Sequence, residues 1–185
     1  VFIILVVLIK LDSKGPVIFT QKRIGKHKKH FDIYKFRTMR IDTPENTPTH
    51  LLENPNQWIT RMGRLMRKTS LDELPQFFNI LKGDMSFVGP RPALWNQYDL
   101  IEEREKYKVH NILPGVTGNA QVSGRDQLLI IDKAKLDGEY LEQMSLLTDI
   151  KLVLKTISIV LKSEGVVEGG TGTTDNKTNR IRSKK

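Results

Sequence analysis

The sequence predicts a small domain of mixed α/β class, close to α+β, in which short strands are combined with amphipathic surface helices. Three observations lead to this fold class. The 185 residues, 38% of them hydrophobic and 28% charged, are sufficient for one domain with its own core. Period-two alternation marks strands in the first quarter of the chain, and apolar residues recur at helical spacing in several later segments.

Residues 1–9 carry no polar side chain, and the run ends at Lys10. As a helix it would be about 14 Å long, half of the roughly 30 Å that separates the two sides of a hydrocarbon core. Because the chain begins inside this run, we expect residues 1–10 to be the remnant of a membrane-inserted helix whose upstream part is missing. A buried β-strand is the alternative, since Val and Ile dominate the run.

A β-hairpin is predicted next. Residues 17–24 form its first strand, which ends at Gly25, and residues 31–39 alternate apolar and polar side chains as its second strand. Residues 42–56 contain three prolines and three asparagines, and we expect a loop there.

Helical spacing of apolar residues predicts four helices, over residues 57–68, 74–82, 96–109 and 149–162. The first has a basic face, which either is solvated or rests on an anionic membrane surface. In the second, one side carries Leu74, Phe77, Phe78 and Leu81, and Gly83 is placed as a C-cap. We expect the catalytic body to extend over residues 11–168 and residues 169–185 to form a basic disordered tail.

The charge and the rare residue types restrict the function. A net charge of +9 indicates an anionic partner, such as nucleic acid, anionic lipid or a phosphorylated substrate. The absence of Cys excludes a disulfide framework, a thiolate metal site and a cysteine nucleophile. The four His do not form the HExxH pattern of a zinc protease.

Asp72 and Glu73 are the strongest candidates for chemistry. A helix start near Asp72, together with Arg67 and Lys68, predicts an ionised carboxylate there and attraction of anions. Adjacent helical residues point about 100° apart, so one carboxylate could act as a nucleophile while the other holds Mg2+. A structural alternative exists, because Ser70 and Glu73 have the spacing of a capping box.

Two further segments could meet a ligand. Prolines on both sides of Arg91 favour a stiff extended backbone, which suits a guanidinium that must bind phosphate; a solvent-facing Arg in a stiff loop is the alternative. Residues 113–125 contain three glycines, so their backbone could approach a ligand closely, with Arg125 at the edge.

These segments, in this order, resemble the bacterial sugar transferases, the monotopic phosphoglycosyl transferases. The resemblance covers about residues 1–168 and rests on five runs: GPVIFTQ at 15–21, IYKFRTM at 33–39, SLDELPQ at 70–76, LKGDMSFVGPRP at 81–92 and PGVTG at 114–118.

The resemblance implies an enzyme that transfers a phospho-sugar from a UDP-sugar to undecaprenyl phosphate and releases UMP. It would act at the cytoplasmic face of the bacterial cell membrane, in the first membrane step of capsular polysaccharide, exopolysaccharide or glycoconjugate synthesis. In the family the Asp of the Asp-Glu pair is the nucleophile, which assigns a covalent phospho-sugar intermediate to Asp72 and binding of Mg2+ to Glu73. Substrate binding is implied for Lys35, Arg37 and Arg91, which lie in the other runs, and for Gln121 and Arg125, which match a further family run at 118–125, GNAQVSGR.

The family fold attaches its α/β domain to a re-entrant membrane helix that is broken at a Ser-Pro pair. No Ser-Pro precedes the apolar run here, so the first half of such a helix is absent from this chain. The resemblance also implies contact with membrane lipids and allows a homodimer. Two other classes of function stay open at this point: a nucleic-acid-binding module, for which no recognised motif is present, and a non-catalytic membrane adaptor with the same fold.

Overall fold

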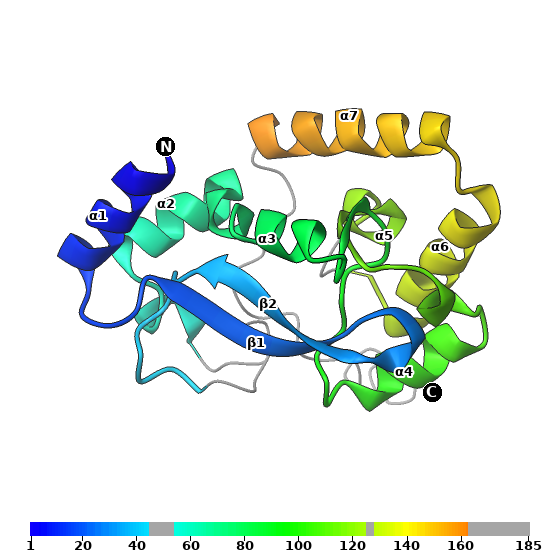
Figure 1. Ribbon diagram of the computed structural model, residues 1–185, viewed down its shortest axis with the longest axis horizontal. Helices are drawn as coiled ribbons and strands as arrows, with labels where there is room; N and C mark the ends of the chain where they lie inside the picture. The colour runs from blue at the N-terminus through cyan, green and yellow to red at the C-terminus, as the bar shows by residue number, and fades with distance from the viewer. Residues whose placement is uncertain (45–53, 125–127, 163–185) are drawn as a thin grey trace, which may run out of the picture.

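The N-terminal apolar run is a helix, α1 (Phe2–Asp12), in the computed structural model, which describes residues 1–44, 54–124 and 128–162 (Figure 1). The strand alternative is therefore wrong. A helix satisfies its own backbone hydrogen bonds, whereas a strand would need a partner. Leu5 and Ile9 pack against Phe36 and Met66 in one of the apolar clusters. Most other α1 side chains are exposed, and no helix in the described part of the chain is long and apolar enough to cross a membrane.

The predicted hairpin is confirmed. Strand β1 (Ile18–Ile24) pairs antiparallel with β2 (His30–Phe36), and a short 3-10 turn, η1 (Lys26–Lys28), connects them. The second strand ends at Phe36, three residues earlier than predicted. The residues that follow turn away, and Arg37 donates hydrogen bonds to the chain segment that precedes β1.

Helix α2 (Arg61–Thr69) starts four residues later than the predicted helix, because a 3-10 turn, η3 (Pro55–Gln57), and an antiparallel bridge between Ile59 and Met39 come before it. Thr60 caps the helix, with its hydroxyl oxygen accepting a hydrogen bond from the Gly63 backbone N at 3.0 Å. A Cβ at Gly63 would lie 1.9 Å from the Thr38 carbonyl oxygen, so this helix turn requires glycine.

Ser70, with a left-handed backbone (φ 57°), ends α2 and leads into the 3-10 turn η4 (Leu71–Glu73) and helix α3 (Gln76–Leu81). The Ser70 side chain makes no cap hydrogen bond, so the capping-box interpretation is wrong. Gly83 (φ 80°) follows the end of α3 in the left-handed conformation that the sequence predicts.

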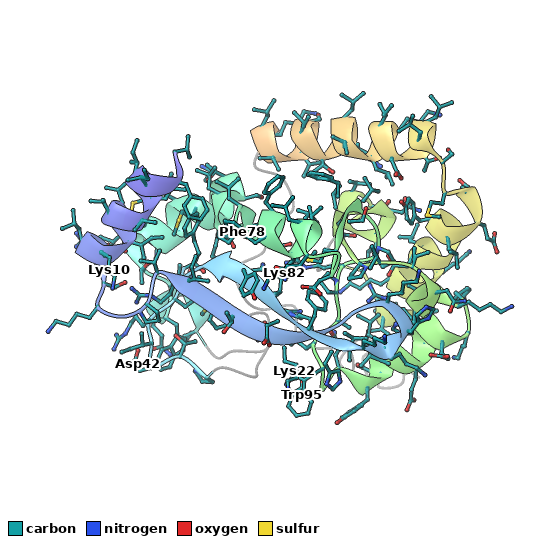
Figure 2. All side chains as sticks on the ribbon, viewed as in Figure 1. Lys10, Lys22, Asp42, Phe78, Lys82 and Trp95 are labelled. Carbon is teal, nitrogen blue, oxygen red and sulfur yellow. The ribbon has the colours of Figure 1, made fainter. Side chains whose placement is uncertain are left out.

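Helix α3 buries polar side chains and exposes apolar ones. Asn79 is fully buried, and it accepts a hydrogen bond from the Tyr34 backbone N at 3.0 Å and donates to the Asp32 carbonyl oxygen at 2.8 Å. These bonds join α3 to the edge of β2 and satisfy the buried amide. The four apolar residues that share one side of the predicted helix, Leu74, Phe77, Phe78 and Leu81, are all exposed. Figure 2 shows Phe78 on the α1 side of α3, where its ring meets Phe2 edge-on with centroids 6.2 Å apart.

The second half of the chain contains a short parallel pair, β3 (Ser86–Val88) and β4 (Gly115–Thr117). Gly115 and Gly118 lie directly against Gly89: a Cβ on either would come within 2.2 Å of Gly89 backbone atoms. These two glycines therefore allow close contact between two backbone segments, and not the approach to a ligand that the sequence predicts.

Helices surround this pair: α4 (Tyr98–Glu105), the 3-10 turn η5 (Val109–Asn111), α5 (Asn119–Val122), α6 (Ile130–Gln143) and α7 (Leu146–Lys162). Helix α4 is shorter than the predicted helix over 96–109, and α7 begins three residues before the predicted 149. Helix α6 was not predicted, because its buried face is made of Ala134, Asp137, Gly138 and Tyr140 and has no apolar stripe. In Figure 1, α7 lies along the upper edge above α3 and α5, and the hairpin lies below α3.

Candidate active site

The Glu73 carboxylate lies between two cations from distant parts of the chain. Its Oε1 accepts hydrogen bonds from Lys35 Nζ at 2.8 Å and from Arg91 Nη2 at 3.1 Å. Lys35 belongs to β2 and Arg91 follows β3, so the fold brings together three residues that the sequence predicts for the site. Charge-assisted bonds of this kind fix the orientation of a carboxylate. The contact also contradicts the alternative of a solvent-facing Arg91.

Asp72 is buried on η4, next to Glu73. Burial raises the pKa of the Asp72 carboxyl above its ordinary value, and the neighbouring Glu73 carboxylate acts in the same direction; the cations Lys35, Arg67 and Arg91 oppose them. The nearby cations act in the direction that the sequence predicts, towards the ionised form, but burial raises the pKa by more than they lower it. Asp72 is nonetheless surrounded by positive charge, as predicted for Arg67.

The backbone that carries Arg91 is held at four successive carbonyls. The Pro90 carbonyl oxygen accepts from the Gly115 backbone N at 2.9 Å, and the Arg91 carbonyl oxygen accepts from Arg104 Nη1 at 2.9 Å. The Pro92 carbonyl oxygen accepts from Arg23 Nη1 at 3.0 Å, and that of Ala93 accepts from the Ile24 backbone N at 3.0 Å. They come from β4, α4 and β1, so three separate elements position this segment. The stiffness that the flanking prolines predict is reinforced by these tertiary hydrogen bonds.

Arg23 is a site residue that sequence reasoning missed. Burial, followed by the neighbouring Arg91 cation, lowers the pKa of Arg23, and the Glu73 carboxylate partly offsets them. Arg23 still carries its charge at neutral pH, since a guanidinium does not lose its proton in proteins. Nothing in the residue pattern of β1 distinguishes Arg23 from Lys22. Its contact with the Pro92 carbonyl and its electrostatic interactions with Arg91 and Glu73 show that it belongs to the site.

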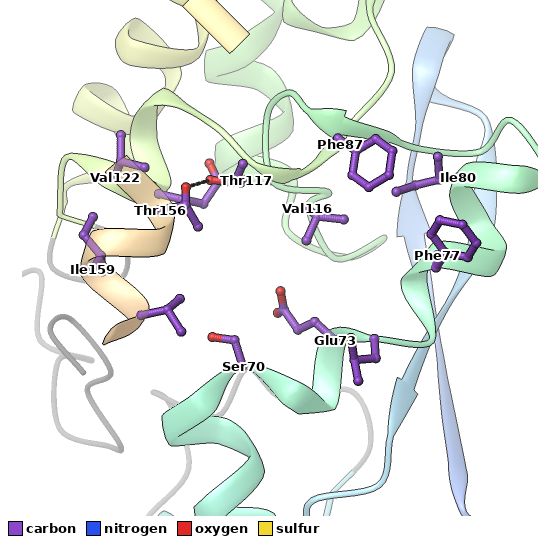
Figure 3. A pocket seen from close by; sticks show the side chains of 13 residues that line it. Ser70, Glu73, Phe77, Ile80, Phe87, Val116, Thr117, Val122, Thr156 and Ile159 are labelled. Atoms are coloured by element: carbon purple, nitrogen blue, oxygen red, sulfur yellow. Dashed lines mark hydrogen bonds between the residues drawn. The ribbon is translucent and has the colours of Figure 1, made fainter. Parts of the chain in front are cut away.

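Gln121 shares a cavity with Glu73. The cavity has a volume of about 240 Å3 and lies between η4, α3, the β3–β4 pair, α5 and α7 (Figure 3). Gln121 is 9% exposed, and neither its Nε2 nor its Oε1 has a hydrogen-bond partner within the described ranges. A buried amide without partners is costly, and a bound polar group would remove that cost.

The remaining predicted residues are elsewhere. The Arg37 guanidinium donates to the carbonyl oxygens of Pro16 at 2.6 Å, Lys14 at 2.7 Å and Ser13 at 2.8 Å, so in this structure it holds the link between α1 and β1. Arg125 lies outside the described residues, as does the predicted tail at 169–185.

The acidic residues near Lys35 and Arg91 fit a magnesium site that includes substrate phosphates. Asp72 and Glu73 supply two adjacent carboxylates, and the described residues contain no group of three or more His, Asp or Glu placed to hold a metal ion. Mg2+ in proteins is often bound by one or two carboxylates together with substrate phosphates and water. The Glu73 carboxylate therefore fits a magnesium site that a substrate phosphate completes.

Comparison with known proteins gives consistent results. A family profile described as bacterial sugar transferase matches residues 1–163. The chain is 44% identical over 165 residues to an uncharacterized sugar transferase, EpsL, of Bacillus subtilis, covering 89% of this chain and 79% of that protein. It is 40% identical over 176 residues to the galactosyl transferase CpsE of Streptococcus agalactiae, covering 89% of this chain and 39% of that protein.

A third relative is the undecaprenyl-phosphate galactose phosphotransferase of Salmonella typhimurium, 39% identical over 165 residues, with 82% of this chain and 34% of that protein covered. The chain thus spans only about a third to two fifths of the streptococcal and Salmonella relatives, but most of the Bacillus one. The profile match covers all of the described residues, including the Asp72-Glu73 pair, Lys35 and Arg91. The chain therefore belongs to the bacterial sugar transferase family.

Proposed function

We propose that the chain transfers a phospho-sugar from a UDP-sugar to undecaprenyl phosphate, through a covalent intermediate on Asp72. The observation that carries the proposal is the buried Asp72, next to the partly buried Glu73, among the cations Lys35, Arg67 and Arg91. The names of the relatives support the acceptor and the reaction, since several are undecaprenyl-phosphate sugar phosphotransferases.

The first half-reaction is attack by an Asp72 carboxylate oxygen on the phosphorus that bears the sugar. The bond between that phosphorus and the bridging oxygen of the diphosphate breaks, and UMP leaves with the bond's electron pair. Asp72 must be ionised to attack, and its surrounding cations help to keep it so. Arg91, on its positioned backbone, is placed to bind a phosphate oxygen.

In the second half-reaction, a phosphate oxygen of the acceptor lipid attacks the same phosphorus. The acyl phosphate bond to Asp72 breaks, the carboxylate is restored, and the product is a sugar linked to the lipid by a diphosphate. Two half-reactions at one site predict ping-pong kinetics. Bound by Glu73 together with substrate phosphates, Mg2+ would neutralise phosphate charge.

The acceptor is a membrane lipid, so the site must lie at the membrane surface. We propose that α1 is part of a re-entrant membrane helix and that the chain lies on the cytoplasmic face of the bacterial cell membrane. The support is the set of exposed apolar residues on α1, α3 and α7, which includes Ile3, Phe77, Leu81, Leu154 and Leu161. Many large exposed apolar side chains on three helices are typical of contact with a membrane or a partner.

The test is UMP release from a panel of UDP-sugars, with Mg2+ and a polyprenyl phosphate in detergent, by the unmodified chain and by Asp72→Asn. We expect Mg2+-dependent release that Asp72→Asn abolishes. Asp42→Asn, a substitution of the same kind at an exposed aspartate, is the control and should retain activity. Equal rates for Asp72→Asn and the unmodified chain would show that Asp72 is not the nucleophile.

A further inference from the structure

The cavity beside Glu73 has a polar end and an apolar body. We propose that it binds the first isoprene units of the polyprenyl phosphate acceptor, with the lipid phosphate at the Glu73 end. The inference rests on the proposed function and adds the place where the acceptor chain is held. Figure 3 shows the Glu73 carboxylate pointing into the cavity, with Phe77, Ile80 and Phe87 on one side and Val122 and Ile159 on the other.

The walls of the cavity are apolar over most of their surface. Its apolar lining comes from α3 and the turn before it, the strand pair, α5 and α7: Leu74, Phe77, Ile80, Phe87, Val116, Val122, Ile159 and Val160. The two threonines in the lining bind each other. Thr156 donates to the Leu152 carbonyl oxygen at 2.7 Å, so Thr117 is the donor in the 2.5 Å contact between the two hydroxyls. Because each hydroxyl group donates to a partner within the protein, neither threonine needs a polar ligand as acceptor.

The size of the cavity indicates which part of a substrate it holds. Its volume of about 240 Å3 is smaller than the roughly 300–1,000 Å3 of sites that bury a whole drug-sized ligand. A nucleotide sugar is polar along its full length and would leave many hydrogen-bonding groups against apolar walls. The beginning of a hydrocarbon chain fits both the volume and the lining.

The apolar lining continues onto exposed surface. Leu74, Phe77 and Phe87, which line the cavity, are also between 41% and 58% exposed. A long chain can therefore enter the cavity at its phosphate end and continue along the apolar side of α3. Gln121 also lines the cavity, and its buried Nε2 has no partner within the described residues, so it is available to donate to a polar group of the bound lipid.

The test fills the cavity from α7. In Ile159→Trp the larger ring replaces a side chain that lines the cavity, and Val160→Phe repeats the change from the neighbouring position. Ile157→Trp is the matched control, because Ile157 lies on the same helix, is 51% exposed and does not line the cavity. Each full-length chain is assayed for the single-turnover burst of UMP from UDP-sugar without acceptor, and then for steady-state turnover with polyprenyl phosphate.

We expect the UMP burst to be unchanged in all variants, since the first half-reaction does not involve the lipid. The KM for polyprenyl phosphate should rise on the order of tenfold in Ile159→Trp and Val160→Phe, equivalent to about 1.4 kcal/mol, and stay unchanged in Ile157→Trp. An unchanged KM in both cavity variants overturns the proposal. A smaller burst or a higher KM for the UDP-sugar also overturns it, because the cavity would then hold the donor.

Failure of the proposed function gives a different result. If the unmodified chain releases no UMP from any donor, the reaction is not the one proposed above. Equilibrium binding of polyprenyl phosphate to the same proteins in detergent does not depend on turnover and still decides the cavity's role. Weaker binding by Ile159→Trp than by Ile157→Trp supports the proposal, and equal binding overturns it.

Discussion

Removal of the Asp137 carboxylate should lower the free energy of unfolding more than most single substitutions, although Asp137 is not a residue of the candidate active site. Arg104 donates to Asp137 Oδ2 from Nε at 2.9 Å and from Nη2 at 2.7 Å, and the side chains are only 5% and 1% exposed. In Asp137→Ala the buried guanidinium has no counter-ion. Leaving one partner of a buried ion pair uncompensated costs about 3–5 kcal/mol, against a total stability of about 5–15 kcal/mol for a typical domain.

The assay is urea unfolding followed by fluorescence of the two tryptophans. Asp42→Ala is the matched control, because Asp42 also pairs with an arginine, Arg40, but both side chains are more than half exposed. Its unfolding midpoint should equal that of the unmodified chain. Equal midpoints for Asp137→Ala and Asp42→Ala would refute the reasoning.

A double variant separates charge from packing. Arg104→Met with Asp137→Leu removes both charges and should recover most of the stability lost in Asp137→Ala, since an apolar pair of similar volume can replace a buried ion pair. It cannot restore the hydrogen bond from Arg104 Nη1 to the Arg91 carbonyl oxygen. We therefore expect a stable protein with a raised KM for UDP-sugar. A double variant no more stable than Asp137→Ala would show that the unpaired charge is not the cause.

Three further outcomes are expected. Because burial raises the pKa of Asp72, kcat/KM should begin to fall at a higher pH on acidification than it would with an ordinary aspartate. Above that pKa the buried, ionised Asp72 lowers the free energy of unfolding. Asp72→Asn removes this cost and should therefore unfold at a higher urea concentration at pH 7. Gly63→Ala should lose about 1–3 kcal/mol in urea unfolding, since its Cβ would meet the Thr38 carbonyl oxygen at 1.9 Å; an unchanged midpoint would contradict this. Leu81→Glu, at a side chain 69% exposed on α3, should keep its fold but co-sediment less with anionic liposomes, and equal sedimentation would argue against membrane contact there.

Features set by near neighbours in the chain could be predicted from the sequence. The hairpin follows from alternation over residues 31–39, and the left-handed Gly83 follows from its place after a helical pattern. The sequence also identifies Asp72, Glu73 and Arg91 as candidate site residues, because each belongs to a long continuous run of residues. Where local patterns were ambiguous, as for residues 1–9, the sequence left helix and strand open, and the structure decides for the helix.

Which face of α3 is buried was decided only by the tertiary structure. Its helical spacing is correct, but Asn79 is buried against β2 through partners 45 and 47 residues away. The pattern of apolar residues cannot reveal such an arrangement, because a polar side chain is buried only where distant backbone groups satisfy it. For the same reason the polar and small buried face of α6 gave no signal.

The sequence by itself determined the chemical groups of this protein: two adjacent carboxylates, the cations Lys35 and Arg91, and the runs that mark the family. The tertiary structure alone decided how they act together. It brings Lys35 and Arg91 onto one Glu73 oxygen, adds Arg23, and places an apolar cavity beside them. The reason is that a residue's type is local, whereas its charge environment, burial and pKa depend on groups that only folding brings within a few ångströms.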